Sequence, residues 1–171
     1  MDQSYQATKL PTAAATNNTG HTTPTAVCSN PSRITADDSS SATWGAYLPG
    51  QGANIVGSAF GFQQLPDSAV IDGIMVYIDG SQTGCFGNVT LNIAGTTGKA
   101  IGALSGSFGG PTDLWGASAI TPADIAALTV AADTEDVSGG DGIASMDYMS
   151  VTVYWHIEVT APAHEVPTRV V

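Results

Sequence analysis

The stretch AVIDGIMVYIDG, residues 69–80, decides the fold of this chain. Ile74, Val76 and Ile78 alternate with residues that are also largely apolar, such as Tyr77, so apolar side chains point to both faces of an extended segment. A strand that is apolar on both faces lies in the middle of a sheet and is covered on both sides. We therefore predict a central, twice-covered strand here.

Short apolar runs recur about every ten residues from Arg33 onward, broken by Gly, Pro, Asp and Ser. The runs 42–48 and 55–62 predict the early strands. In NVTLNIAG, residues 88–95, apolar and polar side chains alternate, which predicts one buried face and one wet face. The same alternation in SMDYMSVTVYWHIEV, residues 145–159, predicts the last strand. This spacing is typical of a sandwich or a barrel.

One helix is predicted, in AITPADIAAL, residues 119–128. Thr121 suits the N-cap, Pro122 fits the first helical position, and Asp124 lies near the positive end of the helix dipole. Together with the strands, this helix predicts an all-β fold, an antiparallel β-sandwich with one short helix.

The two ends of the chain differ in composition from its middle. Residues 1–32 are rich in Thr, Ala and Asn and bury too little apolar surface to order themselves. Residues 159–171 carry two prolines, which cannot donate to a strand ladder. We expect an extended N-terminal arm over 1–32, a sandwich domain over 33–158 and an extended C-terminal tail over 159–171. The arm must then take its order from outside.

The chain is strongly acidic. Its 171 residues include 4 Lys and Arg against 15 Asp and Glu, a net charge of −11. A phosphate backbone repels such a chain, so we expect no nucleic acid partner. Between Ile34 and Thr168 the only base is Lys99. No signal peptide and no stretch of transmembrane length is visible, so we expect no membrane partner and synthesis in a cytoplasm-like compartment.

Enzyme chemistry has little support in the sequence. No Gly-x-Ser-x-Gly, His-Glu-x-x-His or paired Cys-x-x-Cys motif occurs. His21, His156 and His164 fall in the arm, at the end of the last strand and in the tail, which is poor placement for a catalytic triad. We therefore expect no enzyme activity and no cofactor.

An acidic stretch, DTEDVSGGDG over 133–142, contains the weak candidates for a calcium site, which are Asp133, Glu135, Asp136 and Asp141. They lack the alternate-residue spacing of a calcium loop, so we expect a solvated loop and no metal. Cys28 and Cys85 are an even number of cysteines without an export signal. A disulfide between them is possible and not expected.

Two kinds of residue allow both a functional and a structural interpretation. Trp44, Tyr47 and Trp115 sit beside glycines, where a ring can lie flat against a sugar or pack into the core. Asp72 and Asp147 fall inside apolar strands, where an unpaired carboxylate is costly. Each aspartate must therefore reach a backbone N–H or lie at a strand end.

Three segments resemble a pattern of tailed-phage virion proteins: GFQQLPDSAVIDGIMVYIDG, DLWGASAITPADIAAL and MDYMSVTVYW. The shared pattern is an aromatic strand, a proline turn, Ile-x-Gly-Ile-x-Val, a Trp-Gly before a capped helix and a closing strand of alternating valines. It covers about residues 38–156. The resemblance implies a jelly-roll-like sandwich and a structural role, with no catalytic residues.

The resemblance and the extended ends together predict a capsid decoration (cement) protein, assembled in a host cytoplasm and located in the virion. We expect it to bind the major capsid protein, sister copies of itself, or both. The sister copies would form a symmetric oligomer, with a trimer favoured. The residues expected to make these contacts are Tyr5, Lys9, Leu10, Val27, Arg33, Val166, Arg169, Val170 and Val171. The alternatives are a receptor- or carbohydrate-binding module of a tail tip or fibre, with Trp44, Tyr47 and Trp115 as its platform, and a neck or tail-completion protein.

Overall fold

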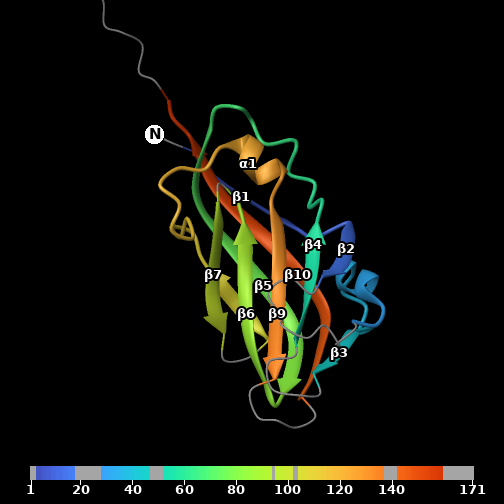
Figure 1. The fold of residues 1–171 in the computed structure, drawn as a ribbon. Coiled ribbons are helices and arrows are strands. Elements are labelled where there is room, and N and C mark those ends of the chain that lie inside the picture. The colour runs from blue at the N-terminus through green and yellow to red at the C-terminus, as the bar shows by residue number, and fades with distance from the viewer. Residues whose placement is uncertain are drawn as a thin grey trace, which may run out of the picture.

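The computed structural model describes residues 3–17, 28–46, 52–93, 95–101, 104–136 and 142–159. These residues form two antiparallel sheets of five strands each, packed face to face (Figure 1). The prediction of an antiparallel β-sandwich with one short helix is confirmed. No helix in the described ranges is long and apolar enough to cross a membrane.

The first sheet, called sheet A, is built around the longest strand of the chain. β10 (Gly142–Ile157) pairs on one side with β5 (Ala69–Thr83), which in turn pairs with β8 (Gly106–Gly109). Its other side pairs with β1 (Gln3–Lys9) over residues 151–157 and with β3 (Ala42–Ala46) over residues 142–146. β5 is therefore an interior strand of the sheet, as the sequence predicts.

The second sheet, called sheet B, has the order β2-β4-β9-β6-β7. Its strands are β2 (Ala13–Asn17), β4 (Gly52–Ser58), β9 (Thr129–Asp136), β6 (Cys85–Asn92) and β7 (Thr96–Ile101). The predicted alternation in β6 is confirmed, because Val89 and Leu91 are fully buried while Asn92 is exposed.

The core lies between the sheets. On β5 the fully buried side chains are Ile74, Val76 and Ile78, and they face sheet B. Met75 and Tyr77, on the opposite face of β5, keep part of their surface exposed. The expectation that this strand is covered on both sides is therefore wrong for the outer face, because sheet B packs only on the inner one.

The N-terminal segment differs from the expected arm over 1–32. β1 pairs with β10 from Gln3 opposite Ile157 to Lys9 opposite Val151, and β2 pairs with β4. The chain crosses from sheet A to sheet B at the buried Pro11. Residues 3–17 thus take their order from their own domain, since the backbone hydrogen bonds of an edge strand need little apolar side-chain surface.

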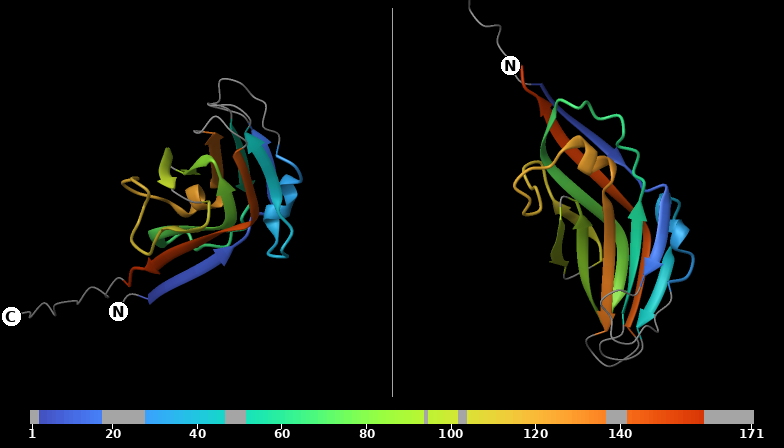
Figure 2. Two further views of the ribbon diagram at one scale, coloured as in Figure 1. Left: turned by 90° about the horizontal axis from the view of Figure 1, so that it is seen from below. Right: turned by 45° about the horizontal axis from the view of Figure 1, so that its top comes forward.

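The C-terminal end of β10 lies beside the start of β1, at one end of the sandwich (Figure 2). Apart from Val159, the tail predicted over 159–171 lies outside the described residues.

One short α-helix and one 3-10 helix complete the fold of the described residues. α1 (Pro122–Ala126) begins at Thr121, whose hydroxyl accepts from the Asp124 backbone N–H while the Asp124 carboxylate accepts from the Thr121 backbone N–H. The predicted cap is confirmed. η1 (Pro31–Thr35), a 3-10 helix, buries Ile34 completely.

The acidic stretch 133–142 is only partly a loop, because residues 133–136 belong to β9. They pair with β6, and Thr134 is buried. The expectation of a solvated loop is wrong for these four residues, because residues 133–135 pair with both β4 and β6 and Asp136 pairs with β6.

Candidate functional site: an aromatic pocket at the end of sheet A

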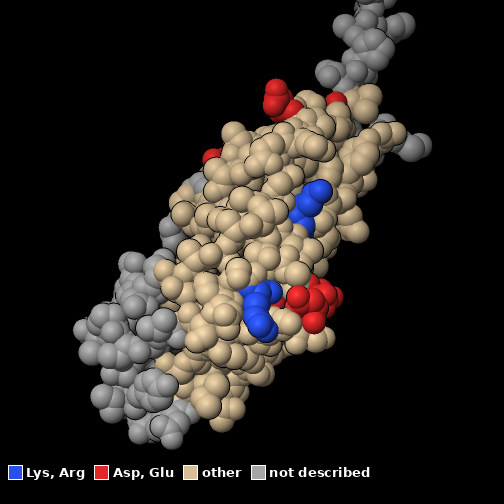
Figure 3. Space-filling view, turned by 90° about the vertical axis from the view of Figure 1, so that its right-hand side faces the viewer, with Lys and Arg blue, Asp and Glu red and all other residues tan. Residues whose placement is uncertain are grey.

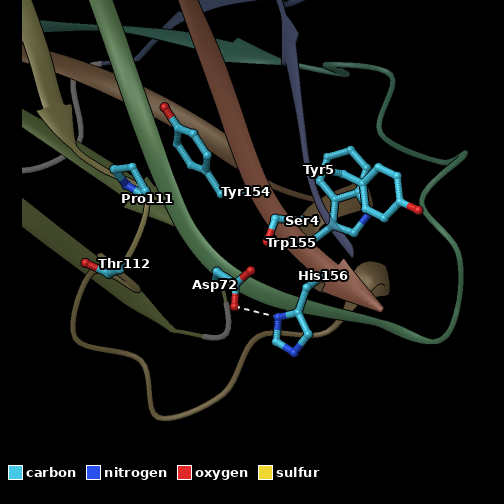
Figure 4. Close-up of a pocket in the computed structure, with 8 residues that line it drawn as sticks. All are labelled: Ser4, Tyr5, Asp72, Pro111, Thr112, Tyr154, Trp155 and His156. Carbon is cyan, nitrogen blue, oxygen red and sulfur yellow. Dashed lines mark hydrogen bonds and ion pairs between the residues drawn. The ribbon is translucent and has the colours of Figure 1, made fainter. Parts of the chain in front are cut away.

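A cavity of about 430 Å³ opens where β1 begins and β10 ends. Three strands of sheet A and the loop after β8 supply its walls (Figure 4). The lining residues are Ser4, Tyr5, Asp72, Pro111, Thr112, Tyr154, Trp155 and His156. We call this cavity the end pocket.

A β-bulge shapes the floor of the end pocket. Tyr154 pairs with Gly73 and Trp155 pairs with Ile71, so Asp72 is an extra residue without a partner in the ladder. Such a bulge re-aims the side chain of the extra residue. At Gly73 an added Cβ would lie 2.3 Å from the Gly110 carbonyl oxygen. Only glycine therefore lets the loop after β8 close against β5 at this point.

The extra residue, Asp72, pairs with a histidine. Asp72 Oδ1 lies 2.8 Å from His156 Nδ1, and the two side chains are 34% and 22% exposed. Figure 4 shows the second ring nitrogen of His156 pointing away from Asp72. The sequence predicts a backbone partner or a strand end for Asp72, and for His156 only a poor placement for a catalytic triad. The pairing was missed because 84 residues separate the two positions, and only the strand register brings them together.

Two stacked aromatic residues also line the end pocket. Tyr5 of β1 stacks on Trp155 of β10 with ring centroids 5.8 Å apart and an interplanar angle of 18°. Tyr5 is 42% exposed, and its hydroxyl donates to Gln3 Oε1. Trp155 also walls a second cavity of about 200 Å³, whose other lining residues include Lys9 and Phe62. The stack therefore offers a partly exposed aromatic surface between the end pocket and the second cavity, on the face of sheet A opposite to the His156 side chain.

The predicted sugar platform is wrong for two of its three members. Trp44 is 3% exposed and its Nε1 donates to Thr134 Oγ1 across the two sheets. Trp115 is also 3% exposed, and its Nε1 donates to the Ile74 carbonyl oxygen at 2.9 Å. Both rings are core residues with their polar atoms satisfied, so neither can present a face to a ligand. Tyr47 lies outside the described residues.

The Trp115 ring also contacts Lys99, the only base between Ile34 and Thr168. Lys99 Nζ lies 5.0 Å from the Trp115 ring centroid and 2.6 Å from Asp113 Oδ2. The hydrogen bond from Lys99 holds the pKa of the Asp113 carboxyl below its ordinary value. This cluster ties β7 of sheet B to the loop that follows β8 of sheet A.

The predicted contact residues are distributed over the molecule. Tyr5 and Lys9 lie on one face of β1, where Tyr5 lines the end pocket and Lys9 the second cavity. Leu10 is partly buried after β1, and Arg33 is exposed in η1. The other predicted contacts lie outside the described residues: Val27, Val166, Arg169, Val170 and Val171.

Of the calcium candidates, only Asp133 has both its backbone and its side chain among the described residues. Asp133 lies in β9 between β4 and β6, partly exposed. Glu135 and Asp136 are in the same strand with side chains outside the described set, as is all of Asp141. Among the described residues, no three His, Cys, Asp or Glu side chains gather to hold a metal ion.

Cys28 is a free, buried thiol. Its sulfur donates to the Ser29 carbonyl oxygen at 3.7 Å. Burial raises the pKa of this thiol to about 11, so at neutral pH it stays protonated.

No protein-family model and no curated protein sequence matches this chain. Solved structures that resemble it include the enzymatically active domain of tailspike protein 4 of bacteriophage CBA120, at 12% identity and a TM-score of 0.40. That match covers 91% of this chain, which spans 19% of the tailspike chain. The xylan-binding module CBM15 matches at 12% identity and a TM-score of 0.44, over 93% of this chain and 100% of its own. TmCBM61 in complex with β-1,4-galactotriose matches at 8% identity and a TM-score of 0.36, over 91% of this chain and 88% of its own. At these TM-scores, function has to be argued from the site itself.

Proposed function

We propose that this chain is a non-enzymatic glycan-binding module whose site is the end pocket. The observation that carries the proposal is a cavity lined both by aromatic residues, Tyr154 and the Tyr5–Trp155 stack, and by the Asp72–His156 pair. A sugar ring has an apolar C–H face and an edge of hydroxyl groups. The flat aromatic surface suits the face, and the neighbouring polar groups suit the edge.

The polar groups of the end pocket offer both kinds of hydrogen-bonding partner. The Asp72 carboxylate accepts hydrogen bonds, while the hydroxyls of Ser4 and Thr112 can donate or accept. These groups line the cavity from β1, β5 and the loop after β8 (Figure 4). A bound sugar would thus find partners for its hydroxyls where it loses contact with water, as burial of polar groups requires.

Charge favours a neutral sugar over an acidic one. The chain carries a net charge of −11, and Asp72 lies in the pocket wall. Figure 3 shows a face on which uncharged side chains dominate, with basic groups at two places and acidic groups beside one of them and near the upper end. A polyanionic glycan would meet repulsion from the whole molecule and from the site.

Binding is favoured over hydrolysis by the geometry around His156. Ser4 lies directly opposite His156 in the β1–β10 register. A Ser-His-Asp triad requires a hydrogen bond from the serine hydroxyl to the histidine. Among the described residues no hydrogen bond joins these two side chains, and the second ring nitrogen of His156 points away from Asp72 (Figure 4).

A glycan-binding module fits a tail tip or fibre of a phage particle, where it would hold a host surface sugar. The capsid decoration hypothesis, with its shell contacts and its trimer, stays a prediction. It loses part of its basis, because residues 3–17 pair within their own sandwich and are not free to reach a neighbour.

The test is a screen of the full chain on an array of neutral and acidic glycans, followed by calorimetry on the hits. We expect Tyr5→Ala to weaken binding about 30-fold, roughly 2 kcal/mol, as for an aromatic hot spot. Tyr5→Phe keeps the ring and should bind nearly as the parent. Arg33→Ala, an exposed change in η1, serves as the matched control. Absence of any neutral glycan among the hits, or equal binding by Tyr5→Ala, would contradict the proposal.

A further inference from the structure

The outer face of sheet A continues from the end pocket as a row of tyrosines. We propose that the ligand is a linear, neutral glycan that runs from the end pocket along this face, over Tyr154 to Tyr77 and Tyr148. This inference rests on the proposed function and specifies its substrate class. We call the row formed by Tyr154, Tyr77 and Tyr148, with the short side chains between them, the tyrosine strip.

The strand register places the strip on one face. In β10, Tyr148, Ser150, Thr152 and Tyr154 alternate with the buried Met149 and its inner-face neighbours. Tyr77 of β5 is the direct partner of Ser150. Residues directly opposite each other in an antiparallel pair share a face, so these side chains all point away from sheet B. His156 follows Tyr154 on that face and joins the strip to the end pocket.

The rings of the strip lie at its two ends. Tyr77 and Tyr148 form a tilted pair with centroids 5.6 Å apart, and the Tyr154 hydroxyl lies 4.0 Å from Met75 Sδ. All three tyrosines are partly exposed. The core of this protein is large enough to bury aromatic side chains. Tyrosines that stay partly exposed and lie close together therefore indicate a binding surface.

Short polar side chains form the floor between the rings. Ser150 is 8% exposed and Thr152 is 4% exposed, although both are on the outer face. The Thr152 hydroxyl is held by that of Thr8 from β1, with 2.8 Å between the two oxygens. Neighbouring side chains therefore cover this floor, so a chain lying along β10 would contact the rings more than these short side chains.

The charges along the strip select a neutral chain. Asp72 lies at the pocket end, and Asp37 and Asp79 lie near Tyr148 at the other end. Burial, and after it Asp37, Tyr77 and Asp79, raise the pKa of Tyr148 above its ordinary value. The described bases are elsewhere: Lys9 lines the second cavity, Arg33 lies in η1 and Lys99 is bound to Asp113.

The length of the strip requires an oligosaccharide. Tyr148 and Tyr154 are six residues apart on one strand, which corresponds to about 20 Å at roughly 3.3 Å per residue. A disaccharide in the end pocket could not reach Tyr148. The strip should therefore add affinity only to longer chains, through additional ring contacts that are made together.

The experiment measures affinity against ligand length. Xylo-, galacto- and manno-oligosaccharides, from disaccharide to hexasaccharide, are titrated into the full chain by calorimetry. We expect affinity to rise with ligand length in at least one series. Tyr148→Ala should lower the affinity for the hexasaccharide about tenfold and leave the affinity for the disaccharide unchanged. Tyr148→Phe keeps the ring and should keep most of the gain. Tyr5→Ala, at the end pocket, should weaken both lengths.

A second readout does not depend on a substituted chain. Nitration of tyrosines in the parent protein, read by mass spectrometry, should be slowed at Tyr77 and Tyr148 by the hexasaccharide and not by the disaccharide. If affinity is independent of length and neither tyrosine is protected, the extended site is overturned while the end pocket stands. If no oligosaccharide binds at any length, the proposed function fails and this inference fails with it.

Discussion

At position 73 the chain has no side chain, and the backbone of Gly110 and Pro111 occupies the space that a Cβ would need. The contact positions the loop whose residues Pro111 and Thr112 line the end pocket. Gly109 is held in the same way, with φ at +85° and an added Cβ only 2.3 Å from the Ile74 carbonyl oxygen. Small changes at these glycines should therefore act on the pocket wall as well as on stability.

Gly73→Ala is expected to lower the free energy of unfolding by about 2–3 kcal/mol, because backbone on the other side of the contact cannot move aside as a side chain could. The measurement is urea denaturation followed by tryptophan fluorescence. Gly110→Ala is the matched control, since a Cβ there meets nothing within 4 Å. Equal stability of the two variants would show that the loop does not depend on the close approach at Gly73.

At the scale of the element, β10 organises the molecule. Its first half pairs with β3 and its second half with β1, while β5 lies along its whole length. The register shifts between Met146 and Tyr148 and between Tyr154 and Trp155. At the first shift the extra residue, Asp147, accepts from the Ser39 backbone N–H at 3.1 Å, as the sequence predicts for an aspartate in an apolar strand. The second shift creates the end pocket.

The link between β7 and the loop after β8 depends on pH. The pKa of Asp113 is lowered in the folded chain by Lys99, so the pair stabilises the fold above the unfolded pKa of about 4. This contribution is lost as the pH falls through the lower, folded-state pKa. Since both side chains are 34% exposed, we expect Lys99→Met to cost less than about 1 kcal/mol near neutral pH.

The check is thermal unfolding of Lys99→Met and the parent at pH 7 and at pH 2. The difference in melting temperature should shrink as the pH falls from 7 toward 2, because Asp113 takes up a proton and its ion pair with Lys99 weakens. A difference of the same size at both pH values would show that Lys99 acts through its packing on Trp115 alone.

At the scale of the whole molecule, the N-terminal residues complete both sheets. A chain that begins at Arg33 would lack β1 and β2, and so would expose the edges of β10 and β4. Exposed edges pair with other chains, so this truncation should aggregate or melt well below the parent. Size-exclusion chromatography with light scattering, and thermal melts, measure both effects.

A truncation after Val159 is the companion experiment, because it leaves every described strand in place. It should match the parent in both measurements. A soluble, equally stable chain beginning at Arg33 would instead restore the hypothesis that residues 1–32 form a docking arm. Light scattering on the parent also tests the trimer expected for a capsid decoration protein.

Local patterns determined much of the fold. The alternation in β6, the interior position of β5 and the cap of α1 depend on residues close together in the chain, so they could be predicted. The sequence likewise determined that the chain is acidic and builds an all-β core. These properties follow from side-chain periodicity and composition, which do not require knowledge of distant contacts.

Only the tertiary structure decided the site. Asp72 meets His156 and Tyr5 meets Trp155 through strand register, which joins positions far apart in the sequence. Other contacts between distant segments bury Trp44 and Trp115 and pair β2 with β4. The physical reason is that an edge strand needs partners for its backbone more than apolar side chains, so composition alone gives no sign of where it will pair.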